Sequence, residues 1–144
     1  PGVGALGMCL TGGFALAMMV DDVVVAPVLS QPSVPFPITS AHRRDLGISD
    51  ADLVTIKRRE DVCVMGLRFT KDVLVPDARF QRLRDELGDR FIAIEIDSSR
   101  GNPHGLPRFA HSVLAYDYVD TPGHPTRVAL DRVLEFFATR LRAS

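Results

Sequence analysis

Three residues far apart in the sequence have the side chains of a nucleophile, an acid and a base: Cys9, Asp72 and His111. A cysteine becomes a strong nucleophile when a histidine takes its proton, and a carboxylate orients that histidine. Each of the three follows an apolar segment that has the composition of a buried strand. Because parallel strands end at one edge of a sheet, where ligands bind in such proteins, we expect the three side chains to meet there.

The segment GMCLTGG around Cys9 is typical of a tight turn between a strand and a helix. Such a turn requires small neighbours, which Gly7 and Gly12 provide, although Thr11 stands where glycine is commoner. The turn would place the thiol at a helix N-terminus, which favours the thiolate, and the Leu10 N–H would face an oxyanion. An ordinary buried cysteine that only packs in the core is the alternative interpretation.

A second glycine pattern, G-x-G-x-x-G, overlaps the first at residues 2–7. This pattern marks a dinucleotide-binding turn when a strand precedes it and an acid follows about twenty residues later, as Asp21 or Asp22 does here. Only Pro1 precedes the pattern, and helix-like residues begin only after Cys9. We therefore favour a nucleophile and no cofactor, with a dinucleotide site as the weaker alternative.

Two histidines follow the last apolar strand segment and compete for the role of the base. His111 has apolar neighbours that would anchor it, whereas His104 stands between a proline and a glycine in a segment rich in loop formers, so we favour His111. His42 and His124 follow no strand and are expected on the surface. Cys63 alternates with valines in the segment VCVMGL, and we expect it to be an inert core residue.

The spacing of the apolar residues predicts an α/β protein. Strands are expected at residues 3–8, 23–28, 62–67 and 91–96. Helices are expected at residues 10–20, 49–59 and 76–87, and in the C-terminal segment after Pro125. The helix at 10–20 is apolar on every side and is therefore expected in the interior. The alternation predicts a mostly parallel sheet with helices on both faces.

The composition narrows the class of protein further. The chain has 144 residues, of which 46% are hydrophobic and 24% charged, as expected for one domain over residues 1–144 with a substantial core. The net charge of −1 disfavours a nucleic-acid-binding protein, and no apolar run reaches the ~18 residues that cross a membrane. The two cysteines cannot form a disulfide framework, and the histidines and cysteines lack metal-ligand spacing, so a cytoplasmic protein without a metal is expected.

Three segments, GMCLTGGFAL, TKDVLVP and RFAHSVL, occur in an order that resembles the dienelactone hydrolase family of α/β-hydrolases. The resemblance implies a catalytic triad of Cys9, Asp72 and His111, a lactone or carboxylic ester as the small-molecule substrate, and no cofactor. The chain departs from the family at Thr11 and Ser112, where family members commonly have glycine.

The resemblance covers the C-terminal part of such a protein, so the expected fold is a partial α/β-hydrolase. It implies further strands upstream of Pro1, with a second oxyanion donor, and a partner that is either this N-terminal half or a second copy of the chain. A non-catalytic binding or assembly module of the same fold is the alternative to an enzyme.

Overall fold

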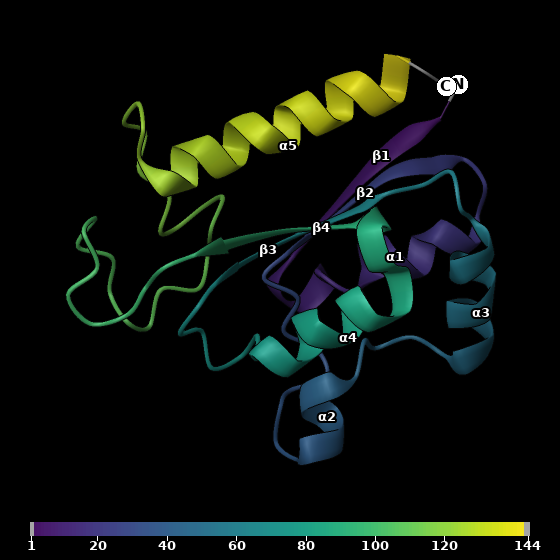
Figure 1. The fold of residues 1–144 in the computed structure, drawn as a ribbon, viewed down its shortest axis with the longest axis horizontal. Helices are drawn as coiled ribbons and strands as arrows, with labels where there is room; N and C mark the ends of the chain where they lie inside the picture. Colours follow the sequence, from purple (N-terminus) through teal and green to yellow (C-terminus); the bar gives the residue numbers. More distant parts are fainter. Residues whose placement is uncertain (1, 143–144) are drawn as a thin grey trace.

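The computed structural model describes residues 2–142 and contains a four-stranded parallel sheet (Figure 1). The strands are β1 (Val3–Met8), β2 (Val24–Ser30), β3 (Val64–Phe69) and β4 (Phe91–Ile96). They lie side by side in the order of the sequence, so β1 and β4 form the two edges of the described sheet. The α/β class predicted from the sequence is thereby confirmed.

Helices cover both faces of the sheet, as predicted. The α-helices are α1 (Phe14–Ala17), α2 (Ser40–Arg44), α3 (Asp50–Arg58), α4 (Asp77–Leu87) and α5 (Pro125–Arg142). The short 3₁₀ segments are η1 (Cys9–Thr11), η2 (Met18–Val20) and η3 (Gly88–Arg90). Helix α5 lies along one face, whereas α1, α3 and α4 lie on the other (Figure 1).

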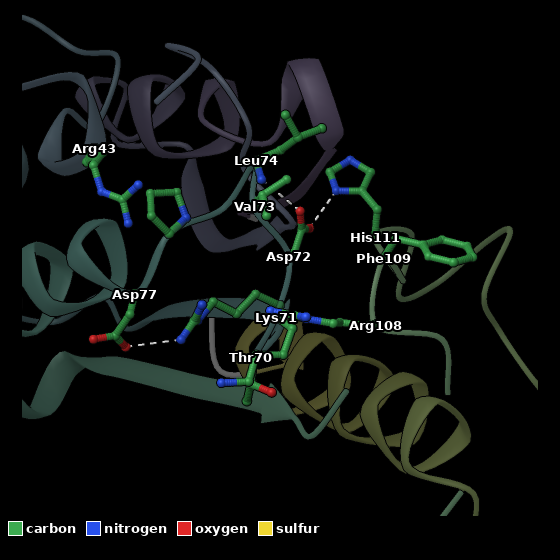
Figure 2. Close-up of a pocket in the computed structure, with 12 residues that line it drawn as sticks. Arg43, Thr70, Lys71, Asp72, Val73, Leu74, Asp77, Arg108, Phe109 and His111 are labelled. Carbon is green, nitrogen blue, oxygen red and sulfur yellow. Dashed lines mark hydrogen bonds and ion pairs between the residues drawn. The ribbon is translucent and has the colours of Figure 1, made fainter. Parts of the chain in front are cut away.

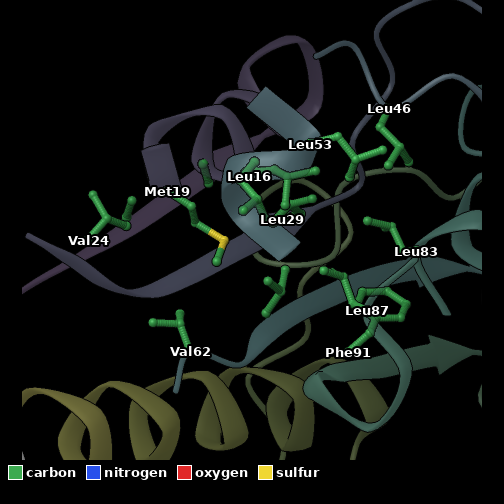
Figure 3. Packing of buried hydrophobic residues seen from close by; sticks show 14 of the residues in the cluster. Leu16, Met19, Val24, Leu29, Leu46, Leu53, Val62, Leu83, Leu87 and Phe91 are labelled. Carbon is green, nitrogen blue, oxygen red and sulfur yellow. The ribbon is translucent and has the colours of Figure 1, made fainter. Parts of the chain in front are cut away.

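Two hydrophobic cores result, one on each face of the sheet. The core beneath α1, α3 and α4 includes Leu16, Leu29 and Leu83 (Figure 3). The core beneath α5 includes Leu67 and Val133. Because the middle strands are buried from both sides, the carboxyl ends of β1 to β4 are held in fixed positions relative to one another.

Two helix ends predicted from the sequence are confirmed: the start of α3 at Ser49 and the end of α4 at Gly88. The Ser49 hydroxyl accepts a hydrogen bond from the Asp52 N–H and caps α3, which ends at Arg58. Gly88 ends α4 with a φ of 57°, a conformation that favours glycine. Helix α2 was not predicted, because it is one short turn between a proline-rich loop and Gly47.

The continuous helix predicted at residues 10–20 is wrong. The segment forms η1, α1 and η2, and its outer side chains are exposed: Leu10 at 54%, Phe14 at 58% and Met18 at 50%. Gly12 and Gly13 disfavour a regular helix at this point. Since β1 is an edge strand, nothing in residues 2–142 covers the outer side of the segment, and the expectation of a fully buried helix fails for that reason.

The glycine pattern of a dinucleotide site does not form a turn. Gly4 and Gly7 lie inside β1, whereas the dinucleotide fingerprint places its glycines between a strand and a helix. In residues 2–142, no helix has the length and apolar character needed to cross a bilayer.

Candidate active site

Cys9 is the first residue after β1 and has a φ of 54°, which is rare for a residue other than glycine. Its neighbours must be small. A Cβ on Gly7 would lie 2.1 Å from the Thr11 carbonyl oxygen, and one on Gly12 would lie 2.5 Å from the Pro32 Cα. The two glycines therefore allow the strained turn to close, and the turn presents the sulfur at the carboxyl end of β1.

Thr11 also supports this turn through two hydrogen bonds to the backbone. Its hydroxyl donates to the Met8 carbonyl at 2.9 Å and accepts from the Met8 N–H at 3.1 Å. Both backbone groups of Met8 are satisfied in this way directly before Cys9. Glycine has no side chain and could form neither of these hydrogen bonds.

The structure brings the three predicted residues together although they come from three different loops. His111 Nε2 lies 3.1 Å from Cys9 Sγ, and His111 Nδ1 lies 2.5 Å from Asp72 Oδ2. The Asp72 side chain is 3% exposed and that of His111 is 23% exposed. Figure 2 shows the carboxylate and the imidazole facing each other across the second of these contacts. One ring nitrogen thus meets the sulfur and the other meets the acid.

Asp72 follows β3 and orients its carboxylate through the backbone. Its Oδ1 accepts a hydrogen bond from the Leu74 N–H at 2.9 Å, which leaves Oδ2 for the imidazole. The residue that precedes α4 is Pro76, and no side chain caps that helix. Asp72 is therefore a buried partner of His111 and does not cap the helix, which was the alternative.

His111 lies on a loop that two residues hold in place, and neither was found from the sequence. Asp117 Oδ2 accepts from the backbone N–H groups of His111 and Ser112, each at 2.9 Å. Gln31, which follows β2, accepts from the Val113 N–H at 3.4 Å. An acid six residues after a histidine is not a recognisable signal, and the Gln31 contact depends on the folding of the whole sheet.

The electrostatics of the site favour an ion pair between Cys9 and His111. Burial by itself raises the pKa of the Cys9 thiol. Hydrogen bonds with His111, the Ser33 hydroxyl and the Leu10 N–H outweigh that effect, and the pKa lies below its usual value. The hydrogen bond to Asp72 raises the pKa of His111 most, burial opposes it and the contact with Cys9 adds to it, giving a pKa of about 9.

The Leu10 N–H, predicted as an oxyanion donor, belongs to the residue directly after Cys9 in η1. This N–H group contributes to lowering the pKa of the Cys9 thiol. An N–H group at this point of the turn is also close to where a carbonyl carbon must lie for attack by the sulfur.

Arg79 is a buried residue near the site that the sequence did not reveal. Its guanidinium donates to four carbonyl oxygens: those of Pro32 and Pro35 in the loop after β2, that of His42 in α2, and that of Asp45 directly after α2. Burial lowers the pKa of this side chain, which is 1% exposed. Arg79 thereby fixes the loop that lies against the Cys9 turn onto helix α4.

The remaining histidines and the second cysteine lie elsewhere. The His104 ring packs against that of His124, with centroids 5.4 Å apart, and His42 is exposed on α2. The prediction that Cys63 lies inside a strand is wrong, because β3 begins one residue later, at Val64. It is partly buried, and its sulfur lies 2.6 Å from Arg140 Nη2.

A cavity of about 510 Å³ opens beside Asp72 and His111 (Figure 2). Its lining combines the apolar Val73 and Phe109 with basic side chains, those of Arg43, Arg68, Lys71 and Arg108. Arg68 is paired with Asp77 and Glu95. Cys9 is not part of the lining, so the cavity lies beside the Cys9 sulfur rather than around it.

No cluster of three or more potential metal ligands occurs among residues 2–142. Comparisons with protein-family models, curated proteins and solved structures found no match to this chain.

Proposed function

We propose that this protein hydrolyses a carboxylic ester or lactone through a covalent acyl-enzyme on Cys9. The observation that carries the proposal is the continuous contact from Cys9 Sγ to His111 Nε2 and from His111 Nδ1 to Asp72. A nucleophile, a base and an orienting acid in this order are what acyl transfer requires. The positive φ of Cys9 supports the same conclusion, since backbone strain often occurs at functional sites.

Acylation begins from the thiolate of Cys9 and the imidazolium of His111. The sulfur attacks the carbonyl carbon, a C–S bond forms, and the carbonyl electron pair moves onto oxygen. The Leu10 N–H stabilises this oxyanion. When the intermediate collapses, the C–O bond to the leaving group breaks, and His111 Nε2 gives its proton to the leaving oxygen.

Deacylation repeats these events with water as the nucleophile. Neutral His111 takes a proton from water, the resulting hydroxide attacks the thioester carbon, and the electron pair again moves onto oxygen. The C–S bond then breaks, which releases the carboxylic acid and restores the Cys9 thiolate beside protonated His111. Asp72 accepts a hydrogen bond from Nδ1 throughout and keeps Nε2 directed at the sulfur.

The fold that fits this mechanism is that of an α/β-hydrolase, and we propose this assignment too. Its support is the order of the site along the sheet: the nucleophile follows β1, the acid follows β3 and the base follows β4. That order of nucleophile, acid and base is the one found in α/β-hydrolases.

The cavity beside His111 favours a substrate with a negatively charged group. Arg43 and Arg108 line it, and the structure gives neither guanidinium an acidic partner within residues 2–142. A guanidinium binds a carboxylate through two parallel hydrogen bonds. We therefore expect a small ester or lactone that carries a carboxylate.

The test is the hydrolysis of an aryl ester by single variants. Cys9→Ala and His111→Ala are each expected to lower kcat/KM by about 100-fold or more, and Asp72→Asn to lower it as well by loss of the correct tautomer. His104→Ala serves as the matched control and is expected to retain activity. Equal activity of Cys9→Ala and the wild type would instead favour a non-catalytic binding module.

A further inference from the structure

Ser33 is a buried residue whose hydroxyl faces the nucleophile. Its side chain has no solvent exposure, and its Oγ lies 3.6 Å from Cys9 Sγ. Its backbone N–H donates to the Cys9 carbonyl at 3.1 Å, so two separate contacts link the residues. Within residues 2–142, Cys9 Sγ is the hydrogen-bond partner that the structure gives to this hydroxyl.

A buried hydroxyl is costly unless its proton is donated to an acceptor. When Cys9 is a neutral thiol either atom of this pair could be the donor, whereas a thiolate has no proton and only accepts, so beside a thiolate the hydroxyl is the donor. The contact therefore favours the charged form of Cys9. His111 is the charged group that lies against Cys9, with Asp72 behind it. Ser33 contacts the same sulfur atom and adds no charge of its own.

The loop that carries Ser33 is held firmly against the turn. Arg79 Nη1 donates to the carbonyl oxygen of Pro32 at 2.7 Å, and the backbone of Pro32 lies directly against Gly12. The loop is thus fixed on one side by a buried guanidinium and on the other by the Cys9 turn. A hydroxyl placed with this much support has little freedom to turn away from the sulfur.

We propose that Ser33 is a fourth functional residue of the site, whose hydroxyl donates a hydrogen bond to Cys9 and holds the sulfur as a thiolate before substrate binds. Arg79 acts as its positioning residue. The proposal rests on the proposed function insofar as Cys9 is the nucleophile. When the thioester forms, the sulfur loses its charge and its hydrogen bond with the Ser33 hydroxyl weakens. When the C–S bond breaks, this hydrogen bond becomes strong again and assists departure of the sulfur.

The test measures the ionisation of Cys9 directly and requires no hydrolysis. The ultraviolet absorbance of the thiolate is followed against pH in a Cys63→Ala background, so that Cys9 is the one thiol observed. Ser33→Ala is expected to raise the midpoint by about one pH unit and to slow alkylation by iodoacetamide by up to about tenfold at pH values below the midpoint of the wild type. Ser33→Thr retains the hydroxyl and is expected to keep a midpoint close to that of the wild type.

The matched control is Thr126→Val, which removes another fully buried hydroxyl. Thr126 contacts Val119 and His124 near the start of α5, and its loss is expected to change the melting temperature but not the midpoint of Cys9. An unchanged midpoint in Ser33→Ala would overturn the proposal. If the midpoint shifts but no ester is cleaved, the assignment of Ser33 stands and the proposed hydrolase activity fails.

Discussion

His111 Nε2 lies 3.1 Å from Cys9 Sγ, although 102 positions separate the two residues in the chain. This contact exists because β1 and β4 are parallel strands of one sheet and both residues follow the carboxyl ends of these strands. A proton can move between the two atoms without rearrangement of the backbone. The contact links the fold to the proposed chemistry.

The turn that carries Cys9 is expected to tolerate no side chain at Gly7. Gly7→Ala places a Cβ 2.1 Å from the Thr11 carbonyl oxygen, and the backbone must move to relieve this overlap. We expect a loss of about 1–3 kcal/mol in the free energy of unfolding, together with slower alkylation of Cys9. Chemical denaturation and labelling with iodoacetamide measure the two effects.

Gly13→Ala is the matched control for this prediction. Gly13 has a helical φ of −69°, and the nearest atom to an added Cβ is 3.4 Å away, an ordinary contact. We expect this variant to be as stable as the wild type or slightly more stable. If Gly7→Ala matched Gly13→Ala in both stability and labelling, the described geometry of the turn would be wrong.

Much of the architecture could be predicted from local sequence. The limits of β1 and β4 agree with the predicted segments. Strand β4 is bounded on both sides by charged and polar residues, and β1 ends at the glycine-flanked turn of Cys9. The prediction failed for residues 10–20, where an apolar sequence was interpreted as a buried helix. Composition alone does not reveal which strand lies at the edge of a sheet, and the exposure of Phe14 and Met18 depends on that.

The site could be predicted in part for a similar reason. Cys9, Asp72 and His111 were found because each follows a strand, and parallel strands bring such positions together. Ser33 was not found, because the segment between β2 and α2 has no regular structure from which a direction could be inferred. Arg79 lies in the predicted helix α4, but three of its four partners lie outside any regular strand or helix, so its role was not found either. Their contacts are made by backbone carbonyls and a loop conformation, for which the sequence has no periodic signal.

The pH dependence of the site follows from two pKa shifts in opposite directions, that of Cys9 downward and that of His111 upward. The pKa of Cys9 is lowered, so the thiolate and hence alkylation at Cys9 should appear at lower pH than for an ordinary thiol. The pKa of His111 is raised to about 9, so ester hydrolysis should fall as the pH rises through about 9 and the proton needed by the leaving group is lost. Rates of hydrolysis and alkylation across the pH range measure both limits.

His111→Gln is the informative variant for this profile. Loss of the imidazolium should raise the pH at which Cys9 reacts, and Cys63 should not change its reactivity in the same sample, as judged by peptide mapping. Preferential labelling of Cys63 in the wild type, or an unaltered profile in the variant, would contradict the ion pair.

The basic side chains of the cavity predict a preference among substrates. Arg108→Gln and Arg43→Gln are expected to raise KM several-fold for an aryl ester that carries a carboxylate, because a charged hydrogen bond is lost in each. For the matching uncharged ester, KM is expected to stay the same. Steady-state kinetics with the two esters decides the point: equal effects on both would show that the arginines do not recognise the charge.

The exposed apolar face near β1 predicts self-association. Leu6, Phe14 and Met18 are exposed together on the edge strand and the segment that follows it. An edge strand with an apolar surface readily pairs with another chain. We expect sedimentation velocity to show dimers or larger species of the 144-residue chain, and Phe14→Glu to shift the population towards monomer.

Ile38→Glu is the control for association. Ile38 is exposed on the loop before α2 and belongs neither to β1 nor to the segment that follows it, so its substitution is expected to have no effect. A wild-type chain that stays monomeric at high concentration would contradict the prediction.

The most direct test of the central claim is mass spectrometry of the protein during turnover of an activated ester. The proposed mechanism predicts one acyl group per chain, found on the peptide that contains Cys9, and its slow loss to water. His111→Ala should prevent or strongly slow its formation, and Cys63→Ala should leave it unchanged. An acyl group on Cys63 or on a lysine, or hydrolysis without any acyl group on Cys9, would contradict the account.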